Sequence, residues 1–155
     1  MAKIQAHSFS SLVGEHAELA RLFNSHQRAL LERNVGTALA VLNTFGDELY
    51  DHIDYEEHAL LPLFAAEGGE TEGATLRIFQ AEHRKLREDT AKLTRKTEQL
   101  SSSSDLMGSI LSLLDEESMF KGLFHHHALR EKNLLFPRLD ERTTEEQRER
   151  LLGYV

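Results

Sequence analysis

Apolar residues recur along the chain at alternating steps of three and four positions, which places them on one face of an α-helix. Four stretches carry this pattern and predict four long amphipathic helices. Their apolar faces contain Leu12, Leu19, Phe23 and Leu30 in the first; Leu39, Leu42, Phe45, Leu49, Leu60 and Leu63 in the second; Leu76, Phe79, Leu86, Leu93 and Leu100 in the third; and Ile110, Leu113, Phe120, Phe124 and Leu135 in the fourth. The chain is therefore expected to be all-α.

The segments between these stretches carry loop and capping signals. Glycine, asparagine and serine gather at residues 34–36, 67–73 and 101–104. Asp105 is expected to cap the fourth helix. Thr143 and Glu146 resemble a capping box that opens a short last helix over about 143–152.

Long helices joined by short loops pack as an antiparallel up-down bundle. At 155 residues the chain is long enough to bury one proper core. We therefore expect residues 1–155 to form a single domain, with the four-helix bundle over about 10–140 and the short C-terminal helix beyond it.

The second half of the chain repeats the first. A shift of 75 residues places the second helix on the fourth, and a shift of 67 residues places the first on the third. The matched residues include His16 with His83, His52 with His127, and Glu56 with Glu131. Two helical hairpins of similar design are thus expected to face each other about a pseudo-twofold axis.

These six polar residues lie on the apolar faces of the helices, because residues four apart stand one turn apart on the same side. In the run from His125 to His127, only His127 is expected to face inward. The midpoint between His16 and His52 falls in the first loop, at residue 34, and that between His83 and His127 at residue 105. Both histidine pairs should therefore lie at one depth of the bundle.

Two carboxylates in the interior of a bundle require a counter-charge, because burying an unpaired carboxylate is costly. The chain has no cysteine, and imidazole with carboxylate suits iron or manganese. Each metal would take two histidines, His16 with His52 and His83 with His127. Glu56 and Glu131 would be shared by both metals. The alternative is a polar histidine–glutamate network without metal.

The chain resembles the hemerythrin-like (HHE cation-binding) domains from about Ser10 to Asp140. The motifs that carry the resemblance are Glu-His16-Ala-Glu-Leu, His52-Ile-Asp-Tyr-Glu56 followed by Leu61-Pro62, Glu-His83-Arg-Lys-Leu, and His127-Ala-Leu-Arg-Glu131 followed by Phe136-Pro137. The resemblance implies a four-helix bundle that holds two non-haem irons joined by an oxo or hydroxo bridge. Manganese or zinc could substitute for the iron.

Oxygen-carrying hemerythrins have a further histidine one turn after the one in the third helix. This chain has Arg87 there, and Ala20 at the matching position of the first helix. The departure argues against reversible oxygen carriage.

Four other residues remain open as ligands or neighbours of the metal. Tyr55 lies beside the apolar face and Glu48 lies one turn before His52, where it could orient that imidazole. His26 is on the apolar face, but about 15 Å along the helix from His16. His126 precedes Glu131 by five residues, and some family members use this spacing between histidine and glutamate.

Composition and charge narrow the class of protein. The formal charge of −8 disfavours nucleic acid and anionic membrane surfaces as partners. Residues 1–12 lack the basic segment and apolar run of a signal peptide, and no apolar run is long enough to span a membrane. A cytoplasmic protein is expected.

The favoured function is a non-haem di-iron protein that binds, senses or processes a small oxidant (oxygen, nitric oxide or peroxide) or handles iron. One alternative is a di-iron enzyme, such as a peroxidase or an iron-sulfur repair factor. The other is a metal-free interaction bundle. The sequence leaves the oligomeric state open.

Overall fold

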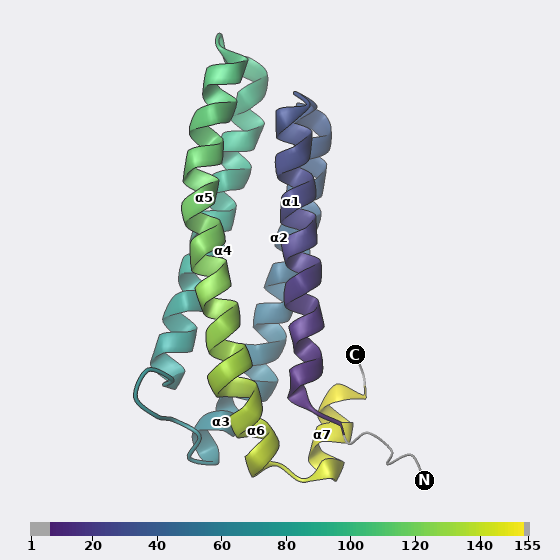
Figure 1. The fold of residues 1–155 in the computed structure, drawn as a ribbon, viewed down its shortest axis with the longest axis vertical. Helices are drawn as coiled ribbons and strands as arrows, with labels where there is room; N and C mark the ends of the chain where they lie inside the picture. Colours follow the sequence, from purple (N-terminus) through teal and green to yellow (C-terminus); the bar gives the residue numbers. More distant parts are fainter. Residues whose placement is uncertain (1–6, 154–155) are drawn as a thin grey trace.

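Four long helices form two antiparallel hairpins that lie side by side in the computed structural model (Figure 1). The structure describes residues 7–153. The long helices are α1 (Val13–Leu31), α2 (Val35–Tyr55), α4 (Leu76–Gln99) and α5 (Leu106–Arg130). The described part contains no strand beyond one isolated bridge in the loop before α4. The all-α bundle expected from the sequence is confirmed, while residues 1–6 and 154–155 of the expected domain lie outside the described part.

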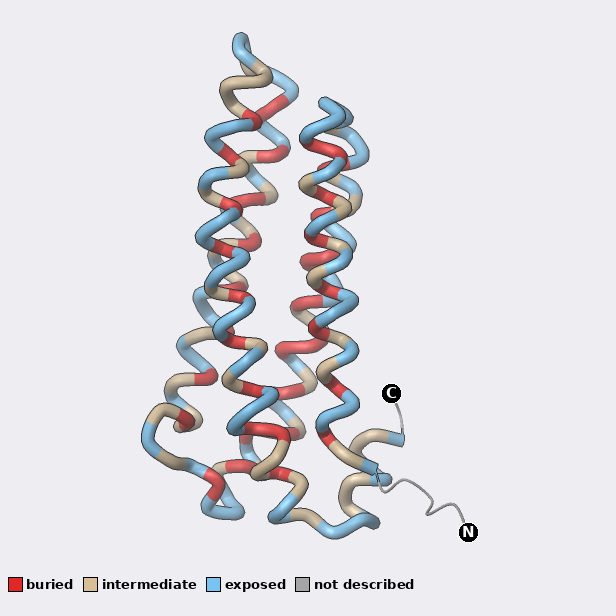
Figure 2. The backbone as a smooth tube through the Cα atoms, in the orientation of Figure 1, coloured by how far each residue is buried: buried red, intermediate tan, exposed pale blue. Residues whose placement is uncertain are grey.

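The apolar faces meet in two separate clusters, which appear as the buried inner stripes of Figure 2. One fills the bundle towards the α1–α2 and α4–α5 loops and includes Phe23, Phe45 and Phe120. The other closes the opposite end and includes Phe64 and Phe136. A layer of buried histidine and glutamate side chains separates the two clusters along the helices.

Two of the long helices change their winding at the glutamates of this layer. A π-helical turn, Glu56–Leu60, joins α2 to α3 (Leu61–Ala66), and a second one, Glu131–Leu135, joins α5 to α6 (Phe136–Arg142). In both, the glutamate carbonyl accepts a hydrogen bond from the N–H five residues later.

A proline stands near the start of each helix that follows a π turn, Pro62 in α3 and Pro137 in α6. Proline has no N–H to donate, and its ring crowds the carbonyl four residues before it, which an ordinary α-turn cannot relieve. The wider π turn lets the chain remain helical past the proline. Both prolines therefore lie at junctions within two helices that continue past them.

The capping predictions hold with one correction. Asp105 caps α5 as expected, accepting a hydrogen bond of 3.0 Å from the N–H of Gly108. The last helix, α7 (Glu145–Leu152), is opened by Thr144 and Gln147 and not by Thr143 and Glu146. Thr143 has another role, because its hydroxyl donates to the carbonyl of Leu139 at the end of α6.

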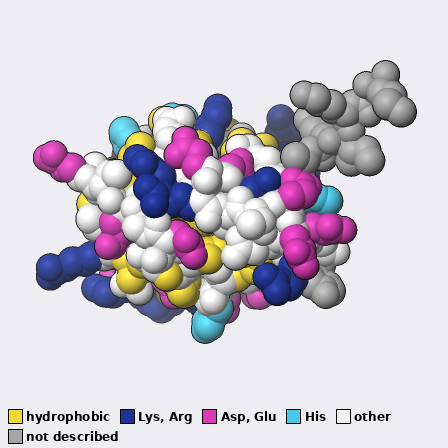
Figure 3. All heavy atoms as spheres, turned by 90° about the horizontal axis from the view of Figure 1, so that it is seen from below, with side chains coloured by type: hydrophobic (Ala, Val, Ile, Leu, Met, Phe, Trp, Pro, Cys, Tyr) yellow, Lys and Arg dark blue, Asp and Glu magenta, His cyan; other side chains and the backbone are white. Residues whose placement is uncertain are grey.

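The lower end of the molecule gathers α3, α6 and α7 (Figure 1). Seen from below, acidic and basic side chains are interspersed over this end, with apolar side chains between them (Figure 3). Arg148 of α7 ties the end together by donating to the carbonyls of His7, Asp140 and Thr143. No helix in the described range 7–153 is long and apolar enough to cross a membrane.

Candidate metal centre

The six side chains expected to bind metal converge in the layer between the two apolar clusters. They form two groups of four, each with ligand atoms within 4.8 Å of one another, and all are buried. One group contains His16, His52, Glu56 and Glu131, and the other contains Glu56, His83, His127 and Glu131. The two glutamates belong to both groups, and their role as shared ligands stays a prediction.

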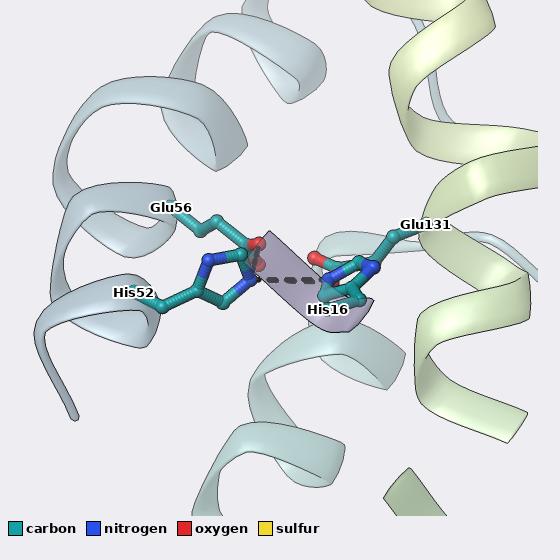
Figure 4. Close-up of side chains that lie close together, drawn as sticks. All are labelled: His16, His52, Glu56 and Glu131. Atoms are coloured by element: carbon teal, nitrogen blue, oxygen red, sulfur yellow. Dashed lines mark hydrogen bonds and ion pairs between the residues drawn. The ribbon is translucent and has the colours of Figure 1, made fainter. Parts of the chain in front are cut away.

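The first group joins α1, α2 and the π turn after α5. His52 and Glu56 project from one helix towards His16 and Glu131 (Figure 4). The Nε2 atoms of His16 and His52 lie 3.2 Å apart, and Nε2 of His16 lies 2.8 Å from Oε1 of Glu131. The imidazole of His52 also forms a close ion pair with Glu56.

The second group repeats this arrangement on α4 and α5. Nε2 of His83 lies 3.1 Å from Oε2 of Glu56, and Nε2 of His127 lies 3.1 Å from Oε1 of Glu131. The ring centroids of His83 and His127 are 4.8 Å apart, close to the 4.9 Å between His16 and His52. The internal repeat of the sequence is therefore a repeat of geometry.

Three buried atoms at the centre have no hydrogen-bond partner among the described residues. They are Oε1 of Glu56, Nε2 of His127 and Oε2 of Glu131. Oε1 of Glu56 lies within ion-pair distance of His52, and Nε2 of His127 lies within ion-pair distance of Glu131, but neither contact has hydrogen-bond geometry. A buried polar atom without a partner is unfavourable in a folded protein. Imidazole nitrogens and carboxylate oxygens left in this state fit metal ions as the missing partners.

Carboxylates outside the layer contact Nδ1, the ring nitrogen that faces away from the centre, in three of the four imidazoles. Nδ1 of His52 lies 2.5 Å from Glu15, Nδ1 of His127 lies 3.1 Å from Glu82, and Nδ1 of His83 lies 3.0 Å from Glu57. A carboxylate at Nδ1 fixes the ring and keeps the proton there, so that Nε2 is free to bind a metal. Glu15 and Glu82 match each other in the repeat.

His16 is the exception among the four. No described residue forms a hydrogen bond with its Nδ1. The residue that would match Glu57 in the repeat is Lys132, which is exposed and cannot accept a hydrogen bond. The two halves of the centre thus share one set of inward-facing donor atoms but differ in what surrounds them.

The pKa values of His52, His127 and Glu131 in this layer are shifted by their charged neighbours. Burial lowers the pKa of His127, but the Glu131 carboxylate outweighs it and the pKa is raised to about 10. Burial also lowers the pKa of His52, but the Glu56 carboxylate outweighs this effect and the pKa of His52 is raised well above its usual value. Burial would raise the pKa of Glu131, but His127 and His16 hold it well below its usual range. Protons thus supply positive charge to the metal-free layer.

The other candidate residues lie away from the centre. The hydroxyl of Tyr55 donates to the carbonyl of Leu151 in α7, at 3.0 Å. Arg87 pairs with Asp54 and lies over the ring of Tyr50, with 5.3 Å to the ring centroid. Neither belongs to the two ligand groups.

Glu48 and His126 are exposed, and neither forms a hydrogen bond with a histidine of the layer. His127 is the inward-facing member of the histidine run, as expected. The orienting role considered for Glu48 belongs to Glu15 in the structure, since Glu15 contacts Nδ1 of His52.

His26 forms a second buried pair, separate from the metal layer. Its Nδ1 donates to the carbonyl of Ala38 at 2.8 Å, and its Nε2 lies 2.6 Å from Oε2 of Glu117. Both side chains are fully buried. Glu117 was missed in the sequence analysis, although it lies between Leu113 and Phe120 on the apolar face of α5, where a lone carboxylate was a detectable signal.

The comparisons with known proteins agree with this geometry. The family model of the hemerythrin HHE cation-binding domain matches residues 7–139. Searches of curated proteins and of solved structures gave no match.

The His26–Glu117 pair generates a prediction about stability. We expect His26→Ala to lower the free energy of unfolding by about 3–5 kcal/mol, because it leaves the Glu117 carboxyl buried without its main partner. Replacing both residues by leucine should recover much of this loss. Urea unfolding of the metal-free variants measures both effects. A loss below about 1 kcal/mol for His26→Ala would show that the pair does not stabilise the fold.

Proposed function

This chain belongs to the hemerythrin HHE cation-binding family, and on that premise we propose that it holds two iron ions and processes a small oxidant. The buried histidine and glutamate groups fit a metal-binding domain. The observation that carries the proposal is the set of three buried, unpartnered atoms on Glu56, His127 and Glu131. Buried polar atoms in a folded protein normally have partners, and bound cations would supply the partners that these three atoms lack.

Six residues would hold the ions. His16 and His52 would bind one, His83 and His127 would bind the other, and the two glutamates contribute to both groups. When bound, the iron pair supplies redox electrons and coordination positions for a small oxidant. The chain supplies the orientation of the ligands, since Glu15, Glu57 and Glu82 hold three imidazoles at Nδ1.

The surroundings favour processing of an oxidant over its reversible carriage. Carriage by oxygen-binding relatives uses a further histidine, at the position that Arg87 occupies here. Arg87 is turned towards Asp54 and Tyr50. Tyr55 does not replace the missing nitrogen, because its hydroxyl is bonded to α7. With two imidazoles available to each ion, both ions would keep positions open to oxygen, nitric oxide or peroxide.

We expect about two irons per chain in protein purified from iron-rich medium. Glu56→Gln and Glu131→Gln should each reduce this content to below about one, since an amide does not bridge cations as a carboxylate does. Glu117→Gln is the matched control, a buried glutamate near Glu131 in sequence but outside the ligand groups, and it should retain both irons. Elemental analysis of the folded variants decides. Full iron content in Glu131→Gln would contradict the ligand assignment.

Metal uptake should release protons. Because the pKa of metal-free His127 is about 10, its imidazole is protonated at neutral pH, and an ion at Nε2 must displace that proton. The apparent metal affinity should therefore fall as the pH is lowered. Calorimetric titration with zinc in two buffers of different ionisation enthalpy gives the number of protons released. Uptake that is independent of pH between about 6 and 8 would contradict this coupling.

The reaction with oxygen separates processing from carriage. We expect the reduced iron protein to change its absorption spectrum on exposure to oxygen and not to recover when oxygen is removed under vacuum. The zinc-loaded protein should show no change. Repeated recovery of the starting spectrum over several cycles would indicate reversible carriage and overturn this part of the proposal.

A further inference from the structure

A cavity of about 370 Å³ opens between α1 and α5 and reaches the ring of His16. It exists because small side chains face each other there, namely Ala17 and Ala20 on α1 and Ala128 on α5. Part of the wall is aromatic and is formed by Phe23, Phe45, Phe120 and Phe124.

The charged residues around this cavity are basic. Lys121 and Lys132 line it together with His125, and no aspartate or glutamate is among its lining residues. The chain has 26 acidic and 18 basic residues, so a lining with lysines alone runs against the overall composition. The groove on the other side of α1 has an acidic lining, which includes the carboxylates of Glu15, Glu18, Glu48 and Asp51.

The two lysines are not equivalent. Lys121 already donates to the side-chain oxygens of Asn24 and Gln27, at 3.2 Å and 3.1 Å. Lys132 makes no hydrogen bond or ion pair with any described residue, and it directly follows the ligand Glu131. Its ammonium group is therefore a positive charge that no described residue pairs, on a cavity that His16 also lines.

The internal repeat indicates what this charge would bind. In one half of the centre, the Glu57 carboxylate accepts the hydrogen bond of Nδ1 of His83, at 3.0 Å. In the other half, Lys132 takes the place of that glutamate, and Nδ1 of His16 has no partner among the described residues. His16 is 6% exposed and is one of the residues that line the cavity. A carboxylate from outside the chain would satisfy both groups.

We propose that this cavity binds an organic monocarboxylate with a short aliphatic tail. The carboxylate lies between the ammonium group of Lys132 and Nδ1 of His16, as Glu57 does at His83. The tail extends along α1 over the four phenylalanine rings. From His16 to Asn24 the lining runs about 12 Å along the helix axis, which accommodates a chain of about eight carbons.

This inference rests on the proposed function in one respect. A metal at Nε2 of His16 leaves the ring proton on Nδ1, where it can be donated to the carboxylate. The apolar part of the site does not depend on the metal. The organic ligand would thus lie against an imidazole that binds iron, which makes it a substrate or a modulator of that centre.

Calorimetric titration of zinc-loaded protein with octanoate tests the proposal without any measurement of activity. We expect octanoate to bind at one site per chain and at least tenfold more tightly than octanol or acetate. Lys132→Glu places the chain's own carboxylate beside His16 and should weaken octanoate at least tenfold. Lys92→Glu makes the same charge change at an exposed position of α4, and should leave the affinity within about twofold. Ala20→Leu, which fills the cavity, should also abolish octanoate binding.

Three results would overturn the proposal: no octanoate binding by the metal-loaded protein, equal binding of octanol, or unchanged binding in Lys132→Glu. Metal content is measured in the same samples. Two bound metals without octanoate binding would reject the cavity ligand alone. Octanoate binding by a protein that takes up no metal would support the cavity and reject the iron centre.

Discussion

Two carboxylates buried in the middle of a helical bundle are the constraint on which the structure depends. Glu56 and Glu131 are fully buried and have oxygens without hydrogen-bond partners among the described residues. Four imidazoles surround them, and in the metal-free protein the raised pKa values of His52 and His127 allow protons on these two rings to provide compensating charge. The apolar clusters above and below surround the layer with non-polar side chains, and a less polar environment strengthens the interaction between the charges there. In the proposed function, a pair of cations would satisfy the same atoms without protons.

Much of this arrangement followed from the sequence, because it depends on periodicity. The steps of three and four fixed which face of each helix is buried, and so placed His127, but not His125 or His126, in the interior. The hairpin midpoints placed both histidine pairs at one depth. Periodicity does not reveal where an α-helix changes to a π-helix. The π turns at Glu56 and Glu131 follow from the proline six residues after each glutamate, a local steric effect.

Contacts between helices that are far apart in the sequence were the other feature that the sequence did not reveal. Glu57 was missed because its partner, His83, belongs to the next hairpin, and no spacing within one helix reveals such a pair. Glu117 was different, since a carboxylate on an apolar face could have been recognised and matched with His26. The capping box was placed one residue early because two adjacent threonines offered the same signal. The repeat also suggested two equivalent halves, whereas Lys132 and the apolar cavity distinguish the surroundings of His16.

The two halves of the chain thus supply the same set of donor atoms but differ in what surrounds these atoms. Beside His16 the difference leaves an apolar cavity lined by Lys121 and Lys132. The account depends above all on metal ions between Glu56 and Glu131. The most direct measurement is diffraction from crystals of the iron-loaded protein at wavelengths on either side of the iron absorption edge. We predict two anomalous peaks within the polar layer, one bonded to Nε2 of His16 and His52 and one to Nε2 of His83 and His127. Peaks confined to the protein surface, or an ordered layer without any peak, would contradict the account.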